Sequence, residues 1–190
     1  LVVNVVVACA ACGPFQANTV QCRGGPGLTA TTLNGTGLSD RTLALTFDGG
    51  PTATTAAIGD FLNASDVRAA FFVDGRYIGQ APDGLNRLKA RGHLVGQRGY
   101  SGTDLSLAPE PALEVRTTDA MVAPYVTGNM FLLRPASGSF DDVLVERLNA
   151  AGLNKYVGPI GWDVGTTGGE FLSDRDCLAQ GQSPGNCAQY

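Results

Sequence analysis

The stretch from Leu43 to Pro51, Leu-Ala-Leu-Thr-Phe-Asp-Gly-Gly-Pro, constrains the fold of this chain more than any other feature. Its apolar first half predicts a short buried strand, and Asp48 follows at the end of that strand. The glycines and the proline then allow the backbone to bend. In α/β proteins, a carboxylate at the end of a buried strand is a common way to present a catalytic group. The stretch therefore predicts an α/β domain with Asp48 in its active site.

The rest of the chain alternates strand-like and helix-like segments. The pattern predicts strands at 42–47, 69–73, 93–96, 130–133 and near 155–158 and 160–164, and helices at 53–64, 81–91, 109–123 and 140–151. Gly92 and Gly152 follow helical stretches, where a left-handed cap is wanted. Because strands that alternate with helices form parallel sheets, the residues alone predict an α/β barrel or a doubly wound sheet.

Length and charge limit the range of functions. A chain of 190 residues forms one domain with a single sizeable core. The net charge is -4, the pI is about 4.8, and the sequence has no cluster of Lys and Arg. These values give no electrostatic reason to expect nucleic acid as a partner.

The segment around Asp48 resembles the first motif of the NodB-type polysaccharide deacetylases, carbohydrate esterase family 4, which usually reads Thr-Phe-Asp-Asp-Gly-Pro. A second segment, Arg134-Pro135-Ala136-Ser137-Gly138, resembles the family's Arg-Pro-Pro-Tyr-Gly. The resemblance implies the α/β fold of that family, a distorted (β/α) barrel. It also implies that Asp48 is the general base and that Arg134 orients it. Pro135, Ser137 and Gly138 would then contact the substrate, with a backbone N–H at Ser137 facing the oxyanion.

A later segment, Gly161-Trp162-Asp163-Val164-Gly165, resembles the family's Trp-Asp-Val-Asp strand. The resemblance implies that Trp162 and Asp163 contact the substrate. Where many members have a tryptophan that lines the acetyl pocket, this chain has Arg175.

The family holds a divalent metal such as zinc with one aspartate and two histidines. The matching positions here are Gly49, Arg98 and Gly102. Glycine offers no ligand atom and arginine repels a cation, so we predict no metal and no other cofactor for this chain. We expect Arg98 to point toward Asp48 and, with Arg134, to replace the missing cation. The single histidine, His93, lies in an apolar run, and we interpret it as a packing residue.

The ends of the chain carry separate expectations. Residues 1–13 are apolar and contain Cys9 and Cys12, which indicates an export or lipoprotein signal, the alternative being an extra buried strand. This signal predicts a secreted or cell-envelope protein that is anchored to the membrane if the signal is of the lipoprotein type. Residues 14–40 are predicted to be a linker. A disulfide between Cys177 and Cys187 fits an oxidising compartment.

The predicted deacetylase domain covers residues 41–190 and is incomplete at its C-terminal end. The family's last motif, a strand ending in Leu-His, has no counterpart before Tyr190. Either the chain is a fragment or the barrel is left open.

Two functions follow from the resemblance. In the first, the chain is a hydrolase that removes N-acetyl or O-acetyl groups from glycans such as chitin, peptidoglycan or xylan, impaired by the loss of the three metal ligands. In the second, it is a non-catalytic glycan-binding domain or scaffold. In both, the expected partner is an acetylated polysaccharide or oligosaccharide. A metal-free hydrolase using Ser101 or Ser137 is not supported, because the chain has no Gly-x-Ser-x-Gly motif and no second histidine.

Overall fold

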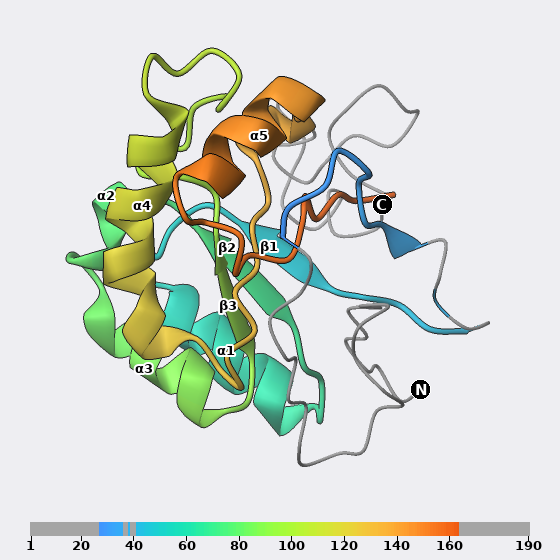
Figure 1. Ribbon diagram of the computed structural model, residues 1–190. Coiled ribbons are helices and arrows are strands. Elements are labelled where there is room, and N and C mark those ends of the chain that lie inside the picture. The colour runs from blue at the N-terminus through green and yellow to red at the C-terminus, as the bar shows by residue number, and fades with distance from the viewer. Residues whose placement is uncertain (1–26, 36–37, 39–40, 164–190) are drawn as a thin grey trace, which may run out of the picture.

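The computed structural model describes residues 27–35, 38 and 41–163 (Figure 1). The predicted signal at 1–13, the proposed Cys177–Cys187 pair and Arg175 lie outside the described residues. Among the helices of the described part, none combines the length and the apolar character needed to cross a bilayer.

A parallel sheet forms the centre of the domain. Its strands are β1 (Thr46–Asp48), β2 (Ala70–Val73) and β3 (Leu94–Gln97), in the order β1-β2-β3. Phe47 lies opposite Phe71, which lies opposite Val95 on the next strand. The prediction of parallel strands is confirmed for these three segments. Because the strands are parallel and neighbouring, their carboxyl ends meet at one edge of the sheet.

The later predicted strands continue this sheet only as isolated parallel bridges. Gln97 bridges to Leu133, Leu132 to Val157, and Leu33 to Ile160. The predictions of full strands at 130–133, 155–158 and 160–164 are therefore too long within the described residues. One physical reason is Pro159, which has no N–H to donate between the two last segments.

Helices surround the sheet in the positions that the sequence pattern predicts. They are α1 (Thr55–Ala64), α3 (Pro82–Ala90), α4 (Pro111–Val122) and α5 (Asp142–Ala150), with a further short helix α2 (Gly75–Ile78) and the 3-10 turns η2 (Ala123–Tyr125) and η3 (Ala136–Gly138). Proline starts α3 and α4, where its missing N–H costs nothing. Asp141 caps α5 by accepting a hydrogen bond from the Leu144 N–H at 2.8 Å.

The two faces of the sheet pack against different parts of the chain, because side chains alternate along each strand. Phe71, Val73 and Val95 face the helices, and Figure 1 shows α1 and α3 on that side. Ala70 and Phe72 face the opposite side and pack with residues of the later bridges, among them Leu132 and Ile160. Helix α5 covers a separate apolar cluster that includes Leu133 and Tyr156.

His93 is fully buried behind β2 and β3. Its Nε2 lies 2.9 Å from the Gly59 carbonyl oxygen, and its Nδ1 accepts a hydrogen bond from the Ala69 N–H at 3.3 Å. These bonds fit a neutral imidazole with the proton on Nε2. Burial lowers the pKa of His93 below its ordinary value of 6.5. The prediction of a packing histidine is confirmed.

Residues 27–35, which fall in the predicted linker, contact the domain. Leu28 is 3% exposed, and its backbone exchanges hydrogen bonds of 3.1 and 3.0 Å with the Asn149 side chain. Leu33 joins Ile160 through the parallel bridge described above. This part of the segment is therefore packed against α5 and the end of the sheet.

Candidate functional site

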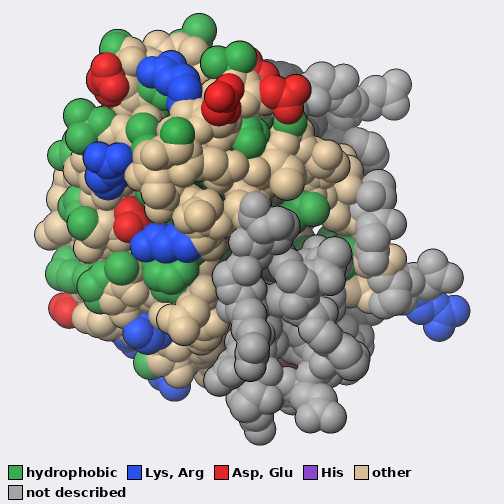
Figure 2. All heavy atoms as spheres, viewed as in Figure 1, with side chains coloured by type: hydrophobic (Ala, Val, Ile, Leu, Met, Phe, Trp, Pro, Cys, Tyr) green, Lys and Arg blue, Asp and Glu red, His purple; other side chains and the backbone are tan. Residues whose placement is uncertain are grey.

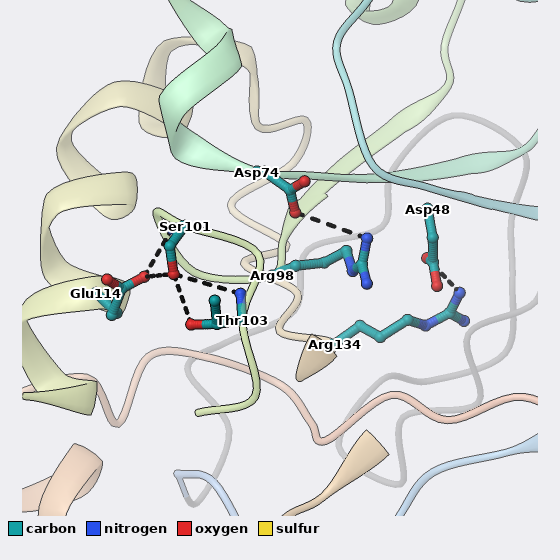
Figure 3. Close-up of polar contacts among 7 residues, drawn as sticks. All are labelled: Asp48, Asp74, Arg98, Ser101, Thr103, Glu114 and Arg134. Carbon is teal, nitrogen blue, oxygen red and sulfur yellow. Dashed lines mark hydrogen bonds and ion pairs between the residues drawn. The ribbon is translucent and has the colours of Figure 1, made fainter. Parts of the chain in front are cut away.

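Four charged side chains follow four neighbouring parallel segments at the carboxyl edge of the sheet (Figure 3). Asp48 ends β1, Asp74 follows β2, Arg98 follows β3, and Arg134 follows the bridge at Leu133. The N–H of Arg98 donates to the Val73 carbonyl at 3.0 Å, which continues the ladder beyond β3. The sequence predicts Asp48, Arg98, Arg134 and Asp163 at this edge but does not predict Asp74.

Arg134 is held on every side of its guanidinium and is 2% exposed. Its Nη1 donates to Asp48 Oδ1 at 2.8 Å and to Thr46 Oγ1 at 2.9 Å. Its Nε and Nη2 donate to the carbonyls of Ile160 and Gly161 at 3.2 and 2.8 Å. Burial lowers the pKa of Arg134, and the charge of Asp48 opposes that effect. Arg134 therefore fixes Asp48 from inside the domain, as the resemblance implies.

Asp48 remains open to solvent in spite of this bond. Its side chain is 34% exposed, against 3% for the side chain of Arg134. The buried arginine therefore holds one carboxylate oxygen, while another part of the carboxylate is accessible from outside. Such an arrangement suits a group that contacts a ligand.

Arg98 pairs with Asp74 and not with Asp48, so our expectation for its partner is wrong. Its Nη1 lies 3.6 Å from Asp74 Oδ1, and within the described residues no ion pair joins Arg98 to Asp48. In Figure 3 the guanidinium lies between the two carboxylates. Asp74 is 5% exposed, and burial raises its pKa while Arg98 opposes that effect. Arg98 turns toward the more buried carboxylate because that one has no other guanidinium bonded to it among the described residues.

The residues at the positions where the resemblance implies metal ligands do not fit a divalent metal. Gly49 and Gly102 carry no ligand atom, and the Arg98 guanidinium brings a positive charge to the same place. A Cβ at Gly49 would lie 3.7 Å from Arg98 Nη1. Within residues 27–35, 38 and 41–163, no three His, Cys, Asp or Glu side chains are grouped so that they could hold a metal ion.

The loop after β3 is fixed by Glu114 of α4 (Figure 3). Glu114 Oε2 accepts hydrogen bonds from the backbone N–H and the hydroxyl of Ser101, at 2.7 and 2.9 Å. The Ser101 hydroxyl also lies 2.7 Å from Thr103 Oγ1. Ser101 therefore anchors the loop that carries Arg98, and this role fits its position better than that of a nucleophile.

The predicted substrate residues occupy different environments. Pro135 is buried, whereas Ser137 and Gly138 are exposed in the turn η3. Trp162 is half-buried beside this turn: a Cβ at Gly138 would lie 3.2 Å from its ring, and the Arg134 guanidinium carbon lies 5.6 Å from the ring centre. The structure thus brings Arg134, Gly138 and Trp162 together.

Asp163, which is exposed, makes a contact within the domain. Its Oδ2 accepts a hydrogen bond from the Gly35 N–H at 2.6 Å, which ties the segment after Trp162 to residues 33–35. The sequence offers no signal for this contact, because the two residues are 128 positions apart.

The face of the described domain in Figure 2 carries acidic and basic side chains that are interspersed. No broad basic patch appears on the described part of this face. The same mixture agrees with the small negative net charge of the chain, -4.

Comparisons with known proteins place these residues in a family. The sequence model of the polysaccharide deacetylase family matches residues 36–156. The chitooligosaccharide deacetylase of Rhizobium leguminosarum bv. trifolii is 33% identical over 132 residues, which cover 67% of this chain and 59% of that protein. The chitin deacetylase of Colletotrichum lindemuthianum is 44% identical over 69 residues, which cover 34% of this chain and 28% of that protein. The chain thus spans less than two thirds of the length of these relatives.

Solved structures agree with this assignment. A mutant of the peptidoglycan deacetylase PdaC from Bacillus subtilis matches with a TM-score of 0.55 and 29% identity, over 64% of this chain and 58% of that one. The family 4 carbohydrate esterase from Streptomyces lividans, in complex with acetate, matches with a TM-score of 0.55 and 26% identity, over 65% and 63%. Since the family model matches more than half of the sequence, the chain belongs to the polysaccharide deacetylase family.

Proposed function

We propose that this domain binds acetylated glycans but has lost the metal-dependent deacetylation that its family resemblance implies. The observation that carries the proposal is the Arg98 guanidinium, which lies 3.6 Å from Asp74 Oδ1 and next to Gly49. A second cation at this place would be repelled by Arg98 and would meet no ligand from Gly49 or Gly102. Without a Lewis acid, no group that the structure describes at this edge of the sheet polarises the acyl carbonyl and activates water at the same time.

The parts of the site that do not depend on a metal support glycan binding. Asp48 keeps an accessible carboxylate held by Arg134. Trp162 lies half-buried next to Gly138 and offers an apolar ring beside these polar groups. Sugars bind where an aromatic ring and a few fixed polar groups converge. Two relatives are named for chitin or chitooligosaccharides, which makes N-acetylglucosamine oligomers the first ligands to test.

We also propose how the sheet closes and where the protein is located. The parallel bridges beyond β3 support a sheet that closes as the family's distorted (β/α) barrel. The apolar run at residues 1–13 supports export to the cell envelope or the exterior, with membrane anchoring if the run is a lipoprotein signal. Fractionation of cells that express the tagged full-length gene tests this second proposal, and cytoplasmic recovery of the whole product would contradict it.

The main experiment measures acetate release and glycan binding on the same preparation. Purified protein is incubated with chitooligosaccharides and with acetylated xylan, in buffer with added Zn²⁺ and in buffer with a chelator. We expect no acetate above the buffer background in either condition. Release that requires Zn²⁺ would restore the metal-dependent enzyme as the correct function, and release that resists the chelator would contradict the loss of catalysis.

Binding is then measured by calorimetry with chitooligosaccharides. We expect weak binding that Trp162→Ala lowers, because the ring loses its contact with the sugar. Phe61→Ala is the matched control, since Phe61 is an aromatic residue of α1 with 71% exposure and lies outside the site. Equal binding by the wild type and the two variants would show that the site near Trp162 does not bind the glycan. The absence of binding in all three would leave the scaffold function of the domain as the better interpretation.

A further inference from the structure

We infer that Asp74 and Arg98 form one unit that replaces the family's divalent metal, and that the Asp74 carboxylate occupies the space that a side chain at position 102 would need. The inference does not depend on glycan binding. It follows that restoring the three metal ligands alone cannot restore a metal site in this chain. Asp74, which the resemblance does not mark, has to change as well.

The first step of the argument is the position of Arg98. Its Nη1 lies 3.6 Å from Asp74 Oδ1 and 3.7 Å from where a Cβ at Gly49 would be. The guanidinium therefore lies within contact distance of the position that carries the family's metal-binding aspartate. The Arg98 side chain is 18% exposed, so it is mostly enclosed by the site and not a surface group.

The second step is the conflict between Gly102 and Asp74. A Cβ at Gly102 would lie 2.7 Å from both Cγ and Oδ1 of Asp74 and 2.8 Å from its Oδ2. Real Cβ atoms do not approach other atoms this closely, so a side chain at position 102 requires the buried Asp74 carboxylate to shift. Gly102 also has a φ of +68°, which disfavours a side chain. Asp74 in its present position thus opposes a histidine at position 102.

The third step is charge. Among the described residues, Arg98 forms the ion pair with the buried Asp74, and Arg76 adds a weaker favourable charge. Removing Arg98 alone takes away the larger counter-charge of a buried carboxylate, which is unfavourable. Removing Asp74 alone takes away the one ion-pair partner that the described residues give Arg98. Each residue therefore stabilises the charge of the other.

The test compares two sets of substitutions by their affinity for Zn²⁺ alone. The first set is Gly49→Asp, Arg98→His and Gly102→His. The second adds Asp74→Ala, which removes the carboxylate that collides with position 102. The control adds Asp83→Ala to the first set instead, because Asp83 is an exposed carboxylate of α3. Affinity is measured by competition with a chromophoric chelator, and folding is checked by circular dichroism.

We expect the first set and its control to bind Zn²⁺ no better than the wild type, and the second set to bind about 10–100-fold tighter. Equal Zn²⁺ affinity in the first and second sets would overturn the inference, because Asp74 would then be no obstacle. A folded second set with no gain in affinity would overturn it as well.

A measurement without metal keeps the inference testable if these variants do not fold. Asp74→Asn, Arg98→Gln and the double variant are compared by thermal unfolding. If the two residues are one unit, the double variant loses less than the sum of the two single losses in Tm. Strictly additive losses would overturn the inference. Because neither assay measures glycan binding or acetate release, a failure here is distinguishable from a failure of the proposed function.

Discussion

Arg134 Nη1 donates a hydrogen bond to Asp48 Oδ1 at 2.8 Å, and this bond joins two residues that are 86 positions apart in the chain. The arginine is buried and also bonds the Gly161 carbonyl, so it links β1 to the segment that leads to Trp162. Its guanidinium carbon lies 4.1 Å from the centre of the Phe72 ring. One side chain therefore connects the candidate site to the core of the sheet.

From this relationship we expect Arg134→Ala to destabilise the domain by about 1–3 kcal/mol, since it leaves the buried Ile160 carbonyl without its partner and removes bonds to three part-buried groups. Urea unfolding followed by circular dichroism measures the loss. Arg87→Ala is the control, because the Arg87 side chain is 56% exposed and its pair with Asp60 should contribute about 1 kcal/mol or less. Similar losses for the two variants would show that Arg134 does not hold the fold together.

Tyr156→Phe tests a buried polar network beside the later bridges. The Tyr156 hydroxyl donates to Asp119 Oδ1 at 2.7 Å and accepts a hydrogen bond from the Gln97 side-chain amide. Burial raises the pKa of Tyr156, with Asp119 adding to the effect, so the hydroxyl stays protonated and able to donate. We expect a loss of about 1–3 kcal/mol in the free energy of unfolding, because the buried Gln97 amide loses a partner. Tyr100→Phe, at a residue that is 40% exposed, should change the stability by less than about 0.5 kcal/mol.

His93 should make the stability depend on pH in a defined window. Its pKa is lowered in the folded state, so the unfolded chain binds a proton more readily below pH 6.5. Neutral His93 therefore makes its full contribution to the free energy of unfolding above about pH 6.5. That contribution is lost as the pH falls toward the folded-state pKa of His93. Because the chain has a single histidine, its imidazole proton resonance can be followed by NMR without assignment. A midpoint at or above pH 6.5 in the folded protein would contradict the expectation. His93→Gln should flatten the pH dependence of urea unfolding between about pH 6.5 and 5.

Glycine at position 137 should make the folded domain more stable than the serine that is present. It is exposed and has a φ of 67°, in the left-handed region that costs a non-glycine residue about 1–2 kcal/mol. Replacement by glycine removes this cost but adds about 0.5–1 kcal/mol of backbone entropy on folding. We expect Ser137→Gly to raise the free energy of unfolding by about 0.5 kcal/mol and Ser137→Val to lower it by about 1 kcal/mol or more. Urea unfolding of both variants checks the order, and a valine variant as stable as the wild type would contradict the role of the turn conformation.

Local sequence patterns and motifs predicted the main helices, the three strands of the sheet and three of the four charged residues of the candidate site. Apolar runs bounded by glycine and proline predicted β1, β2, β3 and the four longer helices, because these signals depend on neighbouring residues in the chain. The resemblance of the motifs around Asp48 and Arg134 also predicted that the two side chains pair. The structure confirms this with a hydrogen bond of 2.8 Å from Arg134 Nη1 to Asp48 Oδ1.

The pairing of Arg98 with Asp74 at the carboxyl edge of the sheet follows only from the tertiary structure. Asp74 directly follows the predicted strand 69–73, as Asp48 follows the first strand, and this signal could have placed it at the same edge. The register of β2 against β3 then brings it beside Arg98. The contact of Asp163 with Gly35 and the contact of Tyr156 with Gln97 arise in the same way. A buried charge takes the partner that is nearest in space, and that distance is set by strand register and burial rather than by separation along the chain.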